Sequence, residues 1–375
     1  MKITVNRTTL LKSLDICSNT LGGKVMLNAY HYFLFDVQGD KCYIYGRGEQ
    51  MQIKTFIPVK SDEDFKFCVP GFKITETVRL LKDEEIILTT KQVEKAFVTT
   101  LTIKGKKNRY QNSGINPDEY PVMKVGKDAK GAMINMESLV KNLLRAQLAV
   151  DGNNLVQSLA GVNISIIDGK LVIRGANNRF MYKGILDAKY VDINITIPKS
   201  TANTVASLPL SPEAKIGTDG THVIVKSGSV QVTAILINTK YPDTEQFFSK
   251  FDQEKYIIID RQELIKSMKV LKLYSNVENR AMTISVNSNL AILSGEDGIG
   301  DASAQEELEV FNSNVEDGFS ISINPTFVLP AITNIESDKV KVHLVDERYF
   351  TFFTEVSDEV TGYWLVAPVY IAPKQ

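Results

Sequence analysis

The chain repeats one pattern of apolar and polar positions three times. The words LLKSL at 10–14, LVKNL at 139–143 and LIKSM at 264–268 place apolar residues three and four positions apart around a central lysine. That spacing is typical of one face of an α-helix. We therefore expect three equivalent amphipathic helices. Their apolar face, as at Leu10, Leu11 and Leu14, would pack on a sheet, and their lysine would point away from it.

A second element recurs at nearly the same interval. Pro70, Pro198 and Pro325 each end a β-branched stretch and precede a helical apolar pattern. Proline in the first helical turn loses no intrahelical hydrogen bond, so each proline predicts the start of a helix. Around these helices the residues alternate between apolar and polar with period two, which is typical of half-buried antiparallel strands.

Four elements thus recur in one order: strand, helix, strands, helix and strands, which is too regular for coincidence. We predict an α+β fold built from three repeated domains, each with two helices packed on antiparallel sheets. Charged, turn-rich flanks such as KVGKDAKGAM and SKFDQEKY are typical of linkers. They divide the chain into domains at residues 1–126, 127–252 and 253–375.

The charges are separated by sign, although the formal net charge is only -1. Acidic residues gather in words that we expect in loops and strands, such as KSDEDF and AQEELE, whereas basic residues gather on the predicted helices. A basic helical surface in a nearly neutral chain favours contact with phosphate. For any single lysine, an ordinary solvated helix face remains the alternative, and the second helix of the third repeat has no basic residue.

Lys266, Lys269 and Lys272 form the densest basic group, because their i, i+3, i+6 spacing keeps them on one side of a helix. The full set of candidate phosphate-facing residues is Lys12, Lys24, Lys73, Arg79, Lys141, Arg145, Lys199, Lys266, Lys269 and Lys272.

No catalytic or metal-binding pattern stands out. His31, His222 and His343 lie far apart in strand-like segments without metal-ligand spacing, and the three cysteines form no CxxC pair. We expect no enzyme activity, no metal and no cofactor. The chain also shows no signal peptide and no stretch of 18 apolar residues, which predicts a cytoplasmic protein with no membrane partner.

Particular words then point to a family. MKITVNRTTLLKSL followed by LGGK, YPDTEQFF, LYSNVENRAM and the ending YWLVAPV appear in the order and spacing of the bacterial DNA polymerase III beta subunit, the sliding clamp, which the whole chain resembles. The resemblance implies a homodimer joined head to tail into a ring, with helices inside and sheet outside. Twelve helices side by side would leave a hole of roughly 20–28 Å, and a DNA duplex is about 20 Å across.

The resemblance implies a processivity factor that encircles double-stranded DNA without reading its sequence. It also implies a hydrophobic pocket for short linear peptides of the replicative polymerase and the clamp loader. Carried over by position, the pocket comprises Leu159, Arg179, Phe180, Pro242, Phe247, Val366, Ala367, Pro368 and Val369. The ring-closing interface would include Tyr110, Leu273 and Tyr274. Ordinary core packing is the alternative for each of these residues.

The sequence departs from the family pattern mainly at this pocket. GANNRFMYK is one residue shorter than the usual motif and has Phe180 in place of leucine, and Tyr370 replaces an arginine. These differences suggest a diverged or auxiliary clamp whose partner peptides differ from the common set. The alternative function is a clamp-fold interaction module or regulator that binds partner peptides without encircling DNA. An enzyme is a distant third reading.

Overall fold

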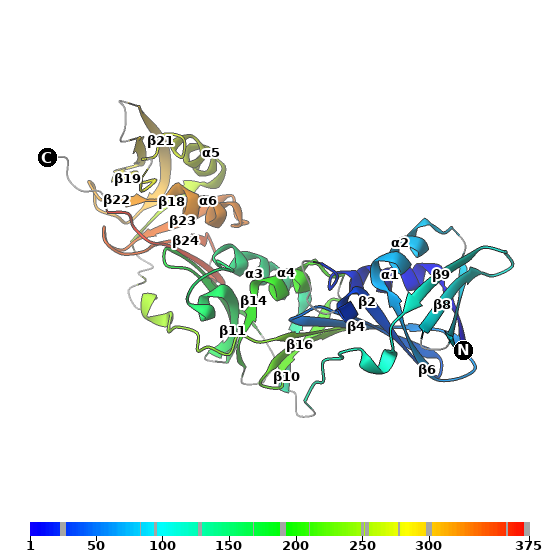
Figure 1. Ribbon diagram of the computed structural model, residues 1–375. Helices are drawn as coiled ribbons and strands as arrows, with labels where there is room; N and C mark the ends of the chain where they lie inside the picture. Colours follow the sequence, from blue (N-terminus) through cyan, green and yellow to red (C-terminus); the bar gives the residue numbers. More distant parts are fainter. Residues whose placement is uncertain are drawn as a thin grey trace. The chain divides into compact units, whose positions relative to one another are not determined.

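The computed structural model describes residues 1–22, 28–82, 84–93, 96–126, 130–167, 169–187, 193–209, 211–248, 251, 255–276, 278–297, 302–357 and 359–370 (Figure 1). Its contacts group the chain into two compact units: Met1–Val140 with Ala188–Ile237, and Lys141–Asp187 with Asn238–Gln375. The division falls inside helix α3 (Met136–Leu148). The three predicted domains stay a prediction.

The first unit contains three other helices: α1 (Arg7–Ser18), α2 (Gly71–Leu80) and α4 (Lys199–Ser207). Its strands are β1 (Lys2–Asn6), β2 (Tyr32–Gln38), β3 (Lys41–Arg47), β4 (Met51–Pro58), β5 (Lys60–Ser61), β6 (Phe65–Pro70), β7 (Glu85–Val93), β8 (Ala96–Ile103), β9 (Arg109–Gly114), β10 (Lys130–Asn135), β14 (Asn194–Pro198), β15 (Glu213–Thr218), β16 (His222–Ser227) and β17 (Val230–Ile235). Apart from β14, they form sheets in the orders β5-β1-β7-β8-β9 and β10-β15-β16-β17-β4-β3-β2-β6.

The second unit contains helices α5 (Arg261–Leu271) and α6 (Pro325–Thr333). Its strands are β11 (Gly161–Ile167), β12 (Lys170–Ala176), β13 (Phe180–Leu186), β18 (Tyr256–Asp260), β19 (Met282–Asn287), β20 (Leu290–Glu296), β21 (Ser303–Ser313), β22 (Ser320–Ile323), β23 (Lys339–Leu344), β24 (Thr351–Glu355) and β25 (Gly362–Val366). They follow one another across a sheet in the order β11-β12-β13-β25-β24-β23-β18-β21-β20-β19-β22. Every pairing given for these strands is antiparallel, as predicted.

Two strand pairings explain why the compact units differ from the sequence repeats. β4 of the first repeat pairs with β17 of the second, with Ile53 opposite Val232. β13 of the second repeat pairs with β25 of the third, with Tyr182 opposite Trp364. Backbone hydrogen bonds therefore continue each sheet from one repeat into the next, and the middle repeat contributes to both units.

The helix starts follow the predicted signals. Pro70 and Pro198 immediately precede α2 and α4, and Pro325 is the first residue of α6. The other starts use polar caps: the Asn6 side chain accepts a hydrogen bond from the Thr9 amide at 3.1 Å at the start of α1. Such a cap satisfies one of the backbone N–H groups that a helix start leaves without a partner.

Two details of the sequence interpretation need correction. His31 ends a 3-10 turn, η1 (Asn28–His31), rather than lying in a strand, while His222 and His343 do lie in strands. The flank KVGKDAKGAM is not wholly a linker, because Lys130–Asn135 forms β10 and pairs with β15. Its alternation of small and apolar residues is compatible with an edge strand, which the lysines and glycines obscured.

Candidate functional site

The three repeated helical words occupy equivalent environments. Their first apolar positions, Leu10, Leu139 and Leu264, are all at most 1 % exposed, and so are their last, Leu14, Leu143 and Met268. Lys12 and Lys266 are exposed and Lys141 is partly exposed. The first helix of the first repeat is α1 and that of the third repeat is α5. Figure 1 draws them in blue and olive. The predicted division into an apolar face and a lysine face is confirmed.

Helix α5 carries the most basic surface of the expected set. Lys266, Lys269 and Lys272 are exposed, and the last of them caps the C-terminal end of the helix. Lys266 lies 4.0 Å from Glu263. Ion pairs between exposed side chains are weak, so Lys266 can still bind another anion. Cations near a helix C-terminus also interact favourably with the helix dipole. Three ammonium groups on one helical side can therefore face an anionic surface together.

Arg145 departs from the expectation of a solvent-facing cation. The residue is 6 % exposed, and its Nη2 donates to the Asn334 carbonyl at 2.5 Å. The same nitrogen lies 3.4 Å from Glu336 Oε1 and 3.3 Å from Glu355 Oε1. A guanidinium held in this way is occupied by the fold itself, so we remove Arg145 from the candidate phosphate contacts.

Lys141 is partly committed to the same cluster, because its Nζ lies 2.6 Å from Glu336 Oε2. The hydrogen bond from Lys141 is the main reason why the pKa of Glu336 lies below its ordinary value. The side chain of Lys141 is nevertheless 38 % exposed. Its ammonium group can exchange this carboxylate for another anion.

The remaining basic candidates differ from one another. Lys73 is exposed on α2, and Lys199 is partly exposed at the start of α4. Arg79 on α2 is exposed but bonded to two carboxylates, with Asp15 Oδ1 at 2.5 Å from its Nη2 and Glu76 as the second partner. Lys24 lies outside the described residues. The structure therefore brings a basic surface together most clearly on α5.

The expected peptide-binding residues come from four segments of the second unit. Phe180 begins β13 and faces Val366 in β25, its antiparallel neighbour. Ala367 donates its amide to the Arg179 carbonyl at 2.8 Å, and Val369 donates to Ser322 at 2.7 Å. Pro368 bridges to Ile323. The chain after β25 is thus held on both sides, which places Arg179 beside residues 366–369.

These residues differ in exposure. Phe180 and Val366 are at most 2 % exposed, and Phe180 stacks on Trp364 with ring centroids 5.6 Å apart. Leu159, Phe247, Ala367, Pro368 and Val369 are partly exposed, and Arg179 and Pro242 are exposed. Neighbouring residues of a strand point to opposite faces of a sheet, so Phe180 and Val366 lie on the face opposite to Met181 and Leu365. Leu159 and Phe247 pack on the Met181 and Leu365 face. The partly exposed apolar residues of that face can receive apolar side chains of a peptide.

Aromatic residues beside the predicted ones extend this surface. Phe247 packs edge-on against Phe350 with ring centroids 5.2 Å apart, and its carbonyl accepts from Tyr349 Oη at 2.9 Å. Leu159, Phe248 and Phe251, like Phe247 and Phe350, pack on one buried cluster. This cluster consists of Ala176, Met181, Phe352 and Leu365. These aromatic neighbours are not among the residues predicted from the sequence. The words QFFSKF and RYFTFF, with their paired phenylalanines, were the available signal.

The expected ring-closing residues lie in different units. Tyr110 is partly exposed on β9, at the edge of its sheet. Leu273 is 80 % exposed just after α5, and Tyr274 is 36 % exposed. Two exposed apolar residues of α2 were not predicted from the sequence: Phe72 is 71 % exposed and Leu80 is 80 % exposed. They lie eight positions apart and so share one helical face.

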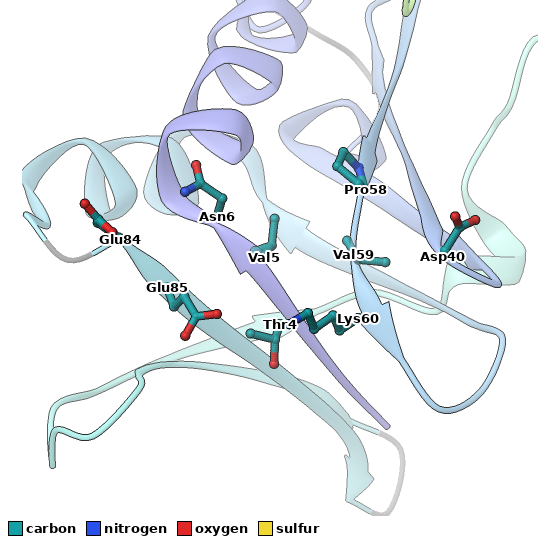
Figure 2. Close-up of a pocket in the computed structure, with 9 residues that line it drawn as sticks. All are labelled: Thr4, Val5, Asn6, Asp40, Pro58, Val59, Lys60, Glu84 and Glu85. Carbon is teal, nitrogen blue, oxygen red and sulfur yellow. The ribbon is translucent and has the colours of Figure 1, made fainter.

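Among the described residues, no group of three or more His, Cys, Asp or Glu side chains could hold a metal ion. A cleft of about 590 Å³ opens in the first unit beside the start of α1, lined in part by residues of β1, β4, β5 and β7 (Figure 2). Its lining contains none of the predicted site residues: Thr4, Val5, Asn6, Asp40, Pro58, Val59, Lys60, Glu84 and Glu85. No helix in the described part of the chain is long and apolar enough to cross a membrane.

Comparisons with known proteins place these features in a family. The model of the DNA polymerase III beta subunit N-terminal domain matches residues 1–124, and the model of its C-terminal domain matches residues 251–368. The beta sliding clamp of Lactococcus lactis is 19% identical over 98% of this chain and 99% of its own length. That of Mycoplasma capricolum is 22% identical over 96% of both.

Solved structures show the same fold at low identity. The DNA polymerase III beta subunit of Pseudomonas aeruginosa has a TM-score of 0.89 and 18% identity, covering 99% of this chain and 100% of that one. A P. aeruginosa sliding clamp bound to griselimycin has a TM-score of 0.88 and 19% identity, with the same coverage. The two family models together match almost two thirds of the chain. The chain therefore belongs to the DNA polymerase III beta subunit family.

Proposed function

We propose that this chain is a sliding clamp: two copies close into a ring around duplex DNA and tether a replicative polymerase, which raises processivity. The match to beta sliding clamps over nearly the whole chain, together with the threefold basic helix, is the observation that carries this proposal. The family is a non-catalytic processivity factor. We extend this to the present chain and infer that it has no enzymatic activity and works in the cytoplasm.

The clamp is proposed to stay on DNA for two reasons: its closed ring encloses the duplex, and its basic residues contact the phosphates. The basic residues are Lys12, Lys73, Lys141, Lys199, Lys266, Lys269 and Lys272, with Lys24 added by resemblance. Ammonium groups that contact phosphate oxygens carry no sequence information, and each contact exchanges readily with salt and water. A closed ring with weak internal contacts can therefore remain on DNA while moving along it.

Ring closure is proposed to join two edges of opposite charge. Lys104, Lys106, Lys107 and Arg109 lie in or before β9, whereas the exposed outer residues of β21 include Glu307 and Glu309. The Ser303–Glu309 part of β21 pairs with β20 on one side. On its other side, β21 pairs with β18 at Val310 and beyond. Two such edges can pair through their backbones, and Phe72, Leu80, Leu273 and Tyr274 can add apolar contact.

The polymerase and the clamp loader are proposed to dock through short linear peptides on the aromatic surface around Phe180, Phe247 and residues 366–369. Support comes from the partly exposed Leu159 and Phe247, which pack on a cluster that contains the buried Met181 and Leu365. A sliding clamp of C. crescentus has been solved with PEG bound to its proposed beta-motif tethering region. Because Phe180 and Tyr370 depart from the family pattern, this chain is proposed to be a diverged or auxiliary clamp with its own peptide preference.

A second function is favoured by one observation. Arg79 and Arg145 are both bonded to carboxylates, which removes two of the expected cations. A clamp-fold regulator that binds partner peptides without encircling DNA would need no basic lining. It would differ from a clamp in its assembly state, because a monomer cannot form the ring.

Loading on DNA of two topologies tests the clamp proposal. The protein would be loaded on nicked circular plasmid with the cognate clamp loader and ATP, isolated by gel filtration, and the plasmid then cut once with a restriction enzyme. We expect the clamp to stay on the circle for many minutes and to leave the linear DNA within seconds to a minute. Equal retention on both forms would contradict topological binding, and no retention on either form would favour the regulator.

A further inference from the structure

A polar row crosses three neighbouring strands in the second unit. Asn163 on β11 is opposite Arg174 on β12, and Arg174 is in turn opposite Lys183 on β13. Arg174 and Lys183 are little exposed, with side chains 8 % and 12 % accessible. Like charges directly opposite each other on a sheet destabilise it, and burial strengthens their repulsion. This row therefore requires an anion.

Glu245 supplies that anion to both cations. Arg174 Nη1 lies 3.1 Å from Glu245 Oε1, and Lys183 Nζ lies 2.5 Å from Glu245 Oε2. Glu245 is the first residue of the short turn η4 (Glu245–Phe247), which belongs to a different segment of the chain. One carboxylate, with one oxygen for each cation, thus joins this turn to two adjacent strands.

The residues around Glu245 hold the same turn. Arg174 Nη1 also donates to Thr244 Oγ1 at 3.3 Å, and its Nη2 donates to Asn163 at 2.8 Å and to Ser165 at 2.7 Å. The Arg174 guanidinium lies 5.6 Å from the ring centre of Tyr241, and the Lys183 ammonium lies 4.3 Å from that of Phe248. Residues 241–248 are therefore fixed to the sheet at four positions, 241, 244, 245 and 248.

This segment carries two walls of the proposed peptide-binding surface. Pro242 and Phe247 lie between the fixed positions of this segment. The ring of Phe247 packs against that of Phe350. Neither Pro242 nor Phe247 contributes a charge. Phe247 packs on a cluster that contains Met181 and Leu365, on the same face of the sheet as Arg174 and Lys183. The place of Pro242 and Phe247 on that face depends on backbone that the Glu245 ion pairs hold in position. A wall that moves by about 1 Å loses van der Waals contact with a bound apolar side chain.

We propose that Glu245, bridging Arg174 and Lys183, is a positioning residue that sets the peptide-binding surface in its binding-competent form. The inference rests on the proposed function of that surface. Glu245 need not touch the peptide itself. When its charge is removed, Arg174 and Lys183 repel each other, and the 241–248 segment loses its link to the sheet, so a ligand must spend binding free energy on ordering it again.

The test combines local exchange with ligand binding. Glu245→Gln keeps the size of the side chain and removes its charge, and Glu336→Gln, at the other two-cation carboxylate of this unit, is the matched control. Hydrogen–deuterium exchange would follow the amides of residues 241–248, and titration calorimetry would measure binding of a synthetic peptide copied from the clamp-binding segment of the cognate replicative polymerase. For Glu245→Gln we expect at least tenfold faster exchange in this segment, unchanged exchange in β11–β13, and at least tenfold weaker binding.

A charge swap distinguishes positioning from a general loss of stability. In Lys183→Glu with Glu245→Lys, the new carboxylate at 183 lies beside Arg174 and the new ammonium, so both pairs can form again. We expect this double variant to recover slow exchange and most of the affinity. Unchanged exchange in Glu245→Gln, or faster exchange with undiminished binding, would overturn the proposal. Wild-type protein that binds no peptide from its own polymerase or clamp loader would contradict the proposed surface, while the exchange data would still decide the anchoring role.

Discussion

At the scale of single residues, Asp219 shows how one carboxylate organises a connection in the first unit. Its Oδ2 accepts from the Gly126 amide at 3.0 Å, and its Oδ1 accepts from the amides of Thr221 at 3.0 Å and His222 at 2.7 Å. Burial alone would raise the pKa of Asp219, but these donors outweigh it and hold the pKa well below its ordinary value. The ionised form is therefore the one that stabilises the fold.

The depressed pKa makes a prediction about pH. Because the unfolded aspartate has a pKa of about 3.9, its contribution is fully present above about pH 5 and is lost as the pH falls toward the lower folded pKa. We expect Asp219→Asn to lower the free energy of unfolding by about 2 kcal/mol at pH 7. The difference from wild type should shrink below pH 4. Urea unfolding followed by circular dichroism checks this, with the exposed Asp62→Asn as control; a pH-independent difference would contradict it.

Single residues also show where the sequence stops being informative. The exposure of Lys12 and Lys266 follows from helical periodicity, which is a local property. The burial of Arg145 does not, because Glu336 and Glu355 lie in distant parts of the chain and no local pattern joins them. Glu245 is a similar case: its word YPDTEQFF points to the family, but its cations come from two other strands.

At the scale of elements, α5 is the clearest candidate for contact with DNA. Lys266→Gln, Lys269→Gln and Lys272→Gln together should remove up to three phosphate contacts in each protomer. The slope of log affinity against log salt should then become shallower by up to about 2.7 per protomer. Measuring equilibrium binding to linear duplex DNA between 50 and 300 mM salt, roughly the range in which such contacts weaken, checks this. As a control, the same change would be made at three exposed lysines in or near β15–β17, where it should leave the slope unaltered: Lys215, Lys226 and Lys240. An unchanged slope in the α5 variant would remove Lys266, Lys269 and Lys272 from the proposed lining.

Elements were predicted better than their connections. The helices that begin at or directly after Pro70, Pro198 and Pro325 follow from proline position, and the antiparallel strands around them follow from period-two alternation. The pairings β4–β17 and β13–β25 could not be predicted, because any half-buried strand of suitable length offers the same backbone groups. For the same reason, repeats read from a sequence need not be the compact units of the folded chain.

At the scale of the whole molecule, the ring depends on two different surfaces meeting. In the proposed head-to-tail dimer, the α2 and β9 surface of one protomer would meet the α5 and β21 surface of the other, at both junctions. Wild-type protein should therefore sediment as a dimer at micromolar concentration. Phe72→Asp and Leu273→Asp should each produce monomers, because a charge would replace exposed apolar contact at both junctions. Met133→Asp, an exposed apolar residue on β10, should remain dimeric.

Mixing the two variants gives the sharper result. In a mixed pair, both substituted surfaces fall at one junction, and the other junction joins two unaltered surfaces. Phe72→Asp and Leu273→Asp, each monomeric alone, should therefore form a dimer together, one that is open at a single junction and is not retained on circular DNA. If both proteins instead used one identical patch, every mixed junction would contain a substitution and no dimer would appear. Complementation in sedimentation thus identifies head-to-tail assembly, whereas wild-type monomers at micromolar concentration would favour the regulator over the clamp.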